Sequence, residues 1–130
     1  MKGKKVLVTN ANGPLGKALA IAAARRGAAK VFMCVSHAPG AEWDRYSKDL
    51  KQVAAECKQA ASEPGFEAFV TPINVSKPEE ARKAAGDLVR VHGVVDLLIN
   101  NAGDDPDVRT NHNRCWPLIL LPWFSRCWKL

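Results

Sequence analysis

The sequence predicts an α/β fold in which a doubly wound parallel sheet is covered by helices on both faces. Short apolar runs alternate with longer amphipathic segments, which is the pattern of repeated strand–helix–strand units. The chain has 130 residues, of which 47% are hydrophobic and 25% charged. These values are ordinary for one soluble globular domain.

The apolar runs predict about four strands. They are Lys5–Thr9, Lys30–Val35, Phe66–Pro72 and Val94–Asn100. Because crossovers between parallel strands are right-handed, and because the chain winds back after the third strand, we expect the sheet order 3-2-1-4. The carboxyl ends of the first and fourth strands then lie side by side, at the crevice where such folds bind ligands.

The first helix is predicted to begin near Gly13, with Asn12 as its N-cap and Pro14 in its first turn. Gly27 follows two arginines and takes the left-handed cap that ends the helix. Helical spacing predicts an apolar face made of Leu15, Leu19 and Ala22.

Two longer helices follow. The second runs from about Glu42 to Ser62, before Pro64-Gly65, and the third begins in the capping box Ser76-Lys77-Pro78-Glu79 and ends at Gly93. The apolar positions expected in the second are Trp43, Tyr46, Leu50, Val53, Ala54, Cys57 and Ala61. Those expected to face the sheet from the third are Ala81, Ala84, Ala85, Leu88 and Val91.

The stretch VLVTNANGPLG joins the first strand to the first helix. A pyrophosphate can sit at a helix N-terminus only if the backbone approaches closely, and a Cβ would obstruct that approach. Gly13 and Gly16 are suitably placed, and Asn10 stands where a further glycine would be expected. Asparagine tolerates positive φ better than other non-glycine residues, so the turn is feasible.

This loop resembles the T-G-x-x-G-x-x-G loop of extended members of the short-chain dehydrogenase/reductase family, with Asn10 in place of the first glycine. Asn100-Asn101-Ala102-Gly103 matches the N-N-A-G signature of shorter members. Asn74-Val75 stands where the family has an Asp-Val that contacts adenine. The resemblance covers the N-terminal, dinucleotide-binding part of that family and implies an incomplete Rossmann-like domain over residues 1–103.

The resemblance also implies the residues of a dinucleotide site. The pyrophosphate would face the glycine loop, the adenine would face Asn74 and Val75, and the adenosine side would lie near the N-N-A-G stretch. The candidate cofactor-binding residues are Thr9, Asn10, Asn12, Gly13, Leu15, Gly16, Ser36, His37, Asn74, Val75, Asn101, Ala102 and Gly103. The alternative is that these are only turn residues of a parallel sheet.

The end of the second strand bears on the choice of cofactor. An acidic residue there would bind the ribose 2′-hydroxyl of NAD, but the chain has Val35, Ser36 and His37. Without a carboxylate to repel a 2′-phosphate, and with two side chains that can donate to it, NADP is favoured over NAD.

The catalytic residues that the resemblance implies are absent. The family uses a Tyr-x-x-x-Lys pair with a preceding serine, well past N-N-A-G, and the tyrosine serves as the general acid or base. The single tyrosine here is Tyr46, in the wrong segment and followed four positions later by Leu50. Because the sequence ends before the expected catalytic region, we expect no catalysis by this chain alone.

Residues 104–130 read as a Trp/Pro-rich tail rather than a separate domain. The tail holds Trp116, Trp123 and Trp128 and lacks a helical or alternating period. It could cover the apolar edge of the fourth strand, or that edge could pair with a second copy or with a full-length relative. A poorly ordered tail is the alternative.

Composition restricts the remaining classes of function. The net charge is +6, but the basic residues are dispersed, so a nucleic-acid surface is not favoured. No apolar segment suits a signal peptide or a membrane span, which makes a cytoplasmic protein the default. The four cysteines suggest reduced thiols, and chance explains His112 and Cys115 with Cys127 better than a metal site does.

The leading hypothesis is therefore an NAD(P)-binding lobe that does not reduce a substrate by itself. An interaction or regulatory module, a pseudoenzyme pairing through the fourth strand and the tail, is the second. Half of an active site completed by another polypeptide and a nucleic-acid-binding protein are the third and fourth.

Overall fold

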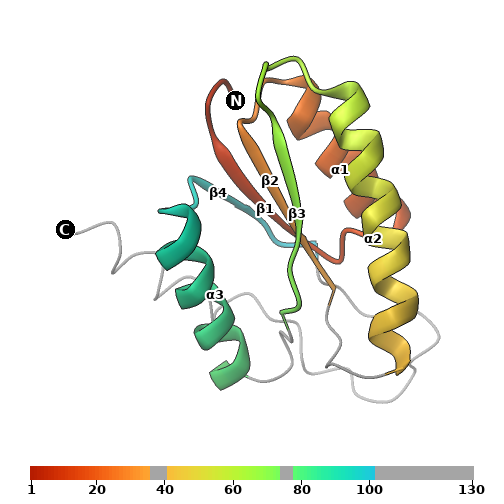
Figure 1. The fold of residues 1–130 in the computed structure, drawn as a ribbon, viewed down its shortest axis with the longest axis vertical. Helices are drawn as coiled ribbons and strands as arrows, with labels where there is room; N and C mark the ends of the chain where they lie inside the picture. Colours follow the sequence, from red (N-terminus) through yellow and green to blue (C-terminus); the bar gives the residue numbers. More distant parts are fainter. Residues whose placement is uncertain (36–40, 74–77, 102–130) are drawn as a thin grey trace.

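The computed structural model describes residues 1–35, 41–73 and 78–101. In these ranges strands and helices alternate strictly along the chain (Figure 1). The strands are β1 (Lys5–Thr9), β2 (Lys30–Cys34), β3 (Glu67–Val70) and β4 (Leu97–Ile99). The helices are α1 (Pro14–Arg25), α2 (Ala41–Ala60) and α3 (Pro78–His92).

The four strands form one parallel sheet in the order β3-β2-β1-β4, which confirms the predicted fold class and strand order. Val8 of β1 lies opposite Met33 of β2 on one side and Ile99 of β4 on the other. The carboxyl ends of the two strands that precede the unusual polar stretches are therefore neighbours.

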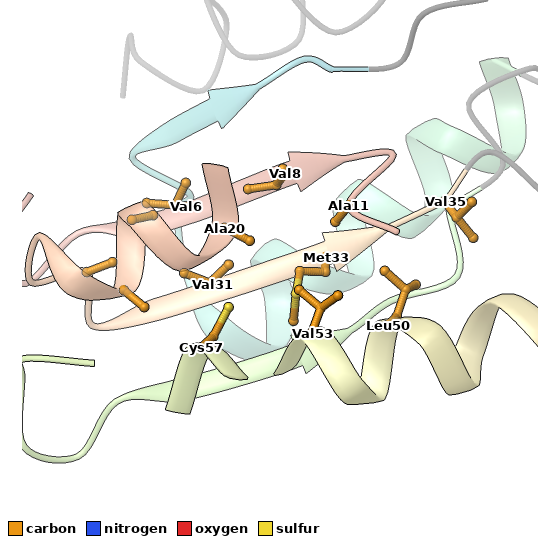
Figure 2. Close-up of a cluster of buried hydrophobic side chains, with 13 residues drawn as sticks. Val6, Val8, Ala11, Ala20, Val31, Met33, Val35, Leu50, Val53 and Cys57 are labelled. Atoms are coloured by element: carbon orange, nitrogen blue, oxygen red, sulfur yellow. The ribbon is translucent and has the colours of Figure 1, made fainter. Parts of the chain in front are cut away.

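Helices cover both faces of the sheet: α1 and α2 pack on one face and α3 on the other (Figure 1). Alternate residues of a strand point to opposite faces, so Val6 and Val8 pack toward α1 while Leu7 packs toward α3. Figure 2 shows the core under α1 and α2, whose larger side chains are Val6, Val8, Val31, Met33, Val35, Leu50, Val53 and Cys57. The core under α3 consists of Leu7, Phe32, Cys34, Ile73, Ala81, Leu88 and Val95.

The buried face of α1 differs from the prediction. Leu15 is 62% exposed and Ala22 is also exposed, whereas the buried residues are Gly16, Ala20, Ala23 and Ala24. Leu19 packs at the margin of the core. The helix turns its smallest residues toward the strands, because small side chains let its backbone lie close to the sheet.

The ends of α1 and α2 are shaped by glycines and by a contact between the helices. Gly27 has φ +86° after α1 and Gly65 has φ +81° in the turn before β3, as expected for left-handed positions. The second helix ends two residues earlier than predicted. There the Ser62 N–H leaves the helix and donates to the Ala24 carbonyl of α1 (3.3 Å).

The C-terminal end of α3 also differs from the prediction. Ala81, Ala85 and Leu88 are buried, but Val91 is 65% exposed. His92 packs instead against the rings of Phe32 and Phe69, with centroid distances of 5.1 and 4.4 Å. Gly93 ends the helix with φ +78°, as predicted, while Ser76 and Lys77 of the predicted capping box lie outside the described residues.

Three strands are shorter than their apolar runs. Phe66 still belongs to the preceding turn, where its N–H donates to the Glu63 carbonyl. Before β4, Asp96 exchanges hydrogen bonds with Lys5: its N–H donates to the Lys5 carbonyl (2.9 Å) and its carboxylate accepts from the Lys5 N–H (2.8 Å). The hydrogen bond from the Lys5 backbone is the main reason that the pKa of Asp96 is lowered.

Among the described residues, no helix combines the length and the apolar character that crossing a membrane requires.

Candidate functional site

The loop between β1 and α1 turns sharply at Asn10, which has φ +50°. The Gly13 N–H donates to the Asn10 carbonyl (3.3 Å), and the Ala11 N–H donates to the Cys34 carbonyl of β2 (3.1 Å). The Asn10 N–H donates to the Cys34 thiol. The expectation that asparagine takes a left-handed turn at this point is confirmed.

Gly16 is required by the fold itself. A Cβ at this position would lie 2.2 Å from the Asn10 carbonyl oxygen and 2.8 Å from the Ala11 Cα. Both obstacles belong to the backbone, so neither can rotate away. The second glycine of the loop therefore allows α1 to pack directly against the end of β1.

Gly13 is not required in the same way. Its backbone lies in the extended region (φ −74°, ψ 160°), which any residue can adopt. A Cβ there would meet only Asn10, with its side-chain nitrogen and its carbonyl oxygen both at ordinary contact distances of 3.6 Å. The packing of the described residues therefore does not by itself require a glycine at this position.

Asn12 does not act as the predicted N-cap. The N-cap is Gly13, and no side chain accepts a hydrogen bond from the first backbone N–H groups of α1. The Asn12 side-chain oxygen is instead buried without a hydrogen-bond partner. A buried acceptor without a donor costs free energy, so Asn12 is suited to a donor supplied by a ligand.

The end of β4 is tied to this loop by hydrogen bonds. The buried Thr9 hydroxyl donates to the Asn100 side-chain oxygen (3.1 Å) and accepts from the Asn101 N–H (2.8 Å). The Asn101 side-chain amide donates to the Asn10 carbonyl (3.3 Å). Three of the predicted site residues, Thr9, Asn10 and Asn101, thus form one connected group with Asn100.

The beginning of α1 favours an anion. Its first turn carries no acidic residue, and its first N–H groups have no side-chain acceptor. Peptide dipoles give a helix N-terminus a partial positive charge. Lys17, the fourth residue of the helix, pairs with Glu56 of α2 (2.6 Å), while the side chain of Leu15, the second residue, is exposed.

The thiol of Cys34, at the end of β2, contacts the backbone of the loop at Asn10. Burial raises the pKa of this thiol to about 12, and the hydrogen bond from the Asn10 backbone opposes part of that rise. Sequence reasoning placed Cys34 in a strand but missed its contact with the loop. No pattern in the sequence signals that contact, because it depends on which strand lies next to β1.

Six predicted site residues lie outside the described part of the chain: Ser36, His37, Asn74, Val75, Ala102 and Gly103. The same holds for His112, Cys115 and Cys127. In the described ranges no group of three or more His, Cys, Asp or Glu residues is placed to hold a metal. Tyr46 lies on α2, where it packs against the core under α1 and α2.

Comparison with known proteins gives consistent matches. The model of the short chain dehydrogenase family matches residues 4–114. Human retinol dehydrogenase 14 is 34% identical over 108 residues, which cover 79% of this chain and 31% of that protein. L-rhamnose-1-dehydrogenase of Scheffersomyces stipitis is 31% identical over 103 residues, covering 79% of this chain and 36% of that protein.

A solved structure shares the same arrangement. A metagenomic short-chain oxidoreductase in complex with NADP superposes with a TM-score of 0.64 at 26% identity, covering 80% of this chain and 41% of the other. The chain thus spans about a third of the length of the curated relatives that it matches. With a family match over most of its length and a sheet of the expected order, the chain belongs to the short-chain dehydrogenase family.

Proposed function

We propose that this chain binds a nicotinamide dinucleotide at the carboxyl ends of β1 and β4. The observation that carries the proposal is Gly13, which has no side chain although the described fold leaves room for one. A pyrophosphate lying over the start of α1 explains why that space is kept open. Membership of the family, and a structural neighbour solved with NADP, support the same ligand.

The residues present suit the parts of such a ligand. Backbone N–H groups at the beginning of α1 would bind the pyrophosphate, and the orphaned Asn12 oxygen would accept a hydrogen bond from a ligand donor. The Asn74–Val75 pair would contact the adenine, and residues 101–103 would line the adenosine side. A bound nicotinamide dinucleotide supplies a hydride donor or acceptor.

We further propose that NADP(H) is preferred to NAD(H). Three residues, Val35, Ser36 and His37, follow β2 at the position where an acidic residue would bind the 2′-hydroxyl of NAD. None of them repels a phosphate, and the last two can donate hydrogen bonds to it.

The 130 residues by themselves bind the dinucleotide without transferring a hydride. Their single tyrosine, Tyr46, is packed on α2 and has Leu50 four positions later instead of a lysine. A tyrosine that serves as a proton donor needs a neighbouring cation to lower its pKa, and no Tyr-x-x-x-Lys pair occurs in this sequence.

A fluorescence titration of the purified chain with NADPH, and separately with NADH, tests this proposal. We expect saturable binding with a micromolar dissociation constant for NADPH and a larger one for NADH. Absence of saturation with both cofactors would refute the proposed function, and tighter binding of NADH would refute only the proposed preference.

A second candidate function is that of an interaction module. Within the described residues, β4 pairs with β1 on one side and with no strand on the other. Val94, just before β4, and Leu97, its first residue, are 55% and 38% exposed. Unpaired strand edges are templates for pairing with another chain. Light scattering over a concentration series distinguishes the two functions, since a module of this kind would form dimers without binding NADPH.

A further inference from the structure

The backbone of Asn10 is held in place from several directions. Its carbonyl accepts hydrogen bonds from the Gly13 N–H and from the Asn101 side chain, both at 3.3 Å. Its N–H donates to the Cys34 thiol of β2. On the helix side, the position of a Cβ on Gly16 would be 2.2 Å from the same carbonyl oxygen. The left-handed turn at Asn10 is therefore fixed by contacts to its backbone.

The Asn10 side chain lies next to the space left open by Gly13. The Asn10 amide nitrogen is 3.6 Å from the place where a Gly13 Cβ would be. Asn10 is half-buried, and none of the described residues holds its side-chain amide by a hydrogen bond. The amide thus lies beside the loop but forms none of the hydrogen bonds that hold the loop together.

We propose that the Asn10 side chain is a gate over the glycine loop, which must rotate aside before a pyrophosphate can reach the beginning of α1. This inference rests on the proposed function and adds a determinant of affinity to that site. Since the backbone is held by β2, β4 and α1, the loop cannot open by moving Asn10 as a whole. The gate therefore lowers affinity through a side-chain rotation that each binding event requires.

The test compares the wild-type chain with Asn10→Gly and Asn10→Asp in NADPH titrations. Glycine adopts positive φ readily, so the first variant removes the gate and keeps the turn. Aspartate has the shape of asparagine and also tolerates this turn, but it places a negative charge beside the proposed pyrophosphate position. Unfolding midpoints of all three proteins show whether the fold is retained.

We expect Asn10→Gly to bind NADPH a few-fold more tightly than the wild type, since no described residue holds the amide that it removes, and Asn10→Asp to bind at least tenfold more weakly. Binding by Asn10→Gly alone would support the gate and refute the proposed function for the wild-type chain. Equal or weaker binding by Asn10→Gly, beside a wild type that binds, would overturn the gate and leave the proposed function intact. If neither the wild type nor Asn10→Gly binds NADPH, both the gate and the proposed function are overturned.

Discussion

Gly13 and Gly16 are three residues apart in the same segment, yet they differ in the space that the fold leaves for a side chain. A Cβ on Gly16 would overlap the backbone of Asn10, whereas a Cβ on Gly13 would only touch Asn10 at 3.6 Å. Gly16 is thus explained by the folded chain alone. Packing within the described residues does not explain Gly13, which the proposed function assigns to the approach of a pyrophosphate.

Under the proposed function, this difference separates a glycine that the fold requires from a glycine that keeps space open for a ligand. A sequence motif gives both glycines the same weight. The structure assigns Gly16 to the contact between α1 and β1, which any sheet of this type needs. Substitutions at the two positions should therefore affect stability and binding in different proportions.

The largest effect is expected from Gly16→Ala. Its methyl group would lie 2.2 Å from a carbonyl oxygen that is held by other hydrogen bonds, so α1 must shift away from the sheet. We expect a loss of about 3 kcal/mol in the free energy of unfolding, measured by urea denaturation. Gly86→Ala in α3 is the matched control, since its Cβ meets nothing within 4 Å and alanine favours a helix. Equal destabilisation by both substitutions would contradict the assignment.

The next effect concerns the connection between the loop and β4. Thr9→Val removes a buried hydroxyl that donates to Asn100 and accepts from the Asn101 N–H. We expect a loss of about 2 kcal/mol in unfolding free energy. Thr9→Ser keeps the hydroxyl, so urea denaturation should find it less destabilised than the valine variant; the reverse order would show that the methyl group matters more than the hydrogen bonds.

A smaller effect follows from the thiol under the loop. Cys34 ionises near its ordinary pKa of 9.0 when unfolded, but its pKa in the folded protein is raised to about 12. The raised pKa lowers the free energy of unfolding only where the unfolded thiol ionises. The stability is therefore fully present below pH 9 and is lost as the pH rises from 9 toward 12. At pH 10 the loss from this group is about 1 kcal/mol.

Urea denaturation of the wild type and of Cys34→Ala at pH 8 and pH 10 checks this expectation. The variant has no thiol at this position, so it should lose less stability over that interval than the wild type. Identical losses in the two proteins would show that Cys34 does not titrate differently in the folded and unfolded states.

The sheet was predictable from the sequence because its signals are local and repeated. Apolar runs alternate with amphipathic segments, and the glycines at 27 and 93 occupy the left-handed positions expected after α1 and α3. The handedness of crossovers then left one strand order. The turn at Asn10 was predictable as well, since few other residues accept positive φ.

The buried faces of the helices were less predictable. Sequence reasoning selects the largest apolar residues as the core, but α1 buries Ala20 and Ala23 and leaves Leu15 exposed. At the end of α3, His92 stacks on two phenylalanines while Val91 points to the surface. In both helices the choice depends on how closely the helix approaches the sheet, which the spacing of residues does not encode.

The individual hydrogen bonds around the loop were not predicted, although the meeting of the first and fourth strands at this edge was. The Cys34 thiol beneath Asn10 and the Thr9 hydroxyl shared with β4 join segments far apart in the sequence. Their partners follow from the register of neighbouring strands, which the spacing of apolar residues does not reveal.

Whether a pyrophosphate lies beside Gly13 is tested by comparing Gly13→Asp with Gly13→Asn. Both side chains are favourable N-caps, so each variant should keep its unfolding free energy within about 1 kcal/mol of the wild type, and the aspartate should interact well with the helix dipole. The aspartate would also lie beside the proposed pyrophosphate and repel it.

The deciding measurement is the dissociation constant of NADPH for the two Gly13 variants, taken with their unfolding free energies. We expect Gly13→Asp to be at least as stable as Gly13→Asn but to bind NADPH at least tenfold more weakly. Equal affinities for NADPH in two equally stable variants would contradict the proposal that a pyrophosphate binds beside Gly13. A charge at Gly13 would then lie far from any bound phosphate.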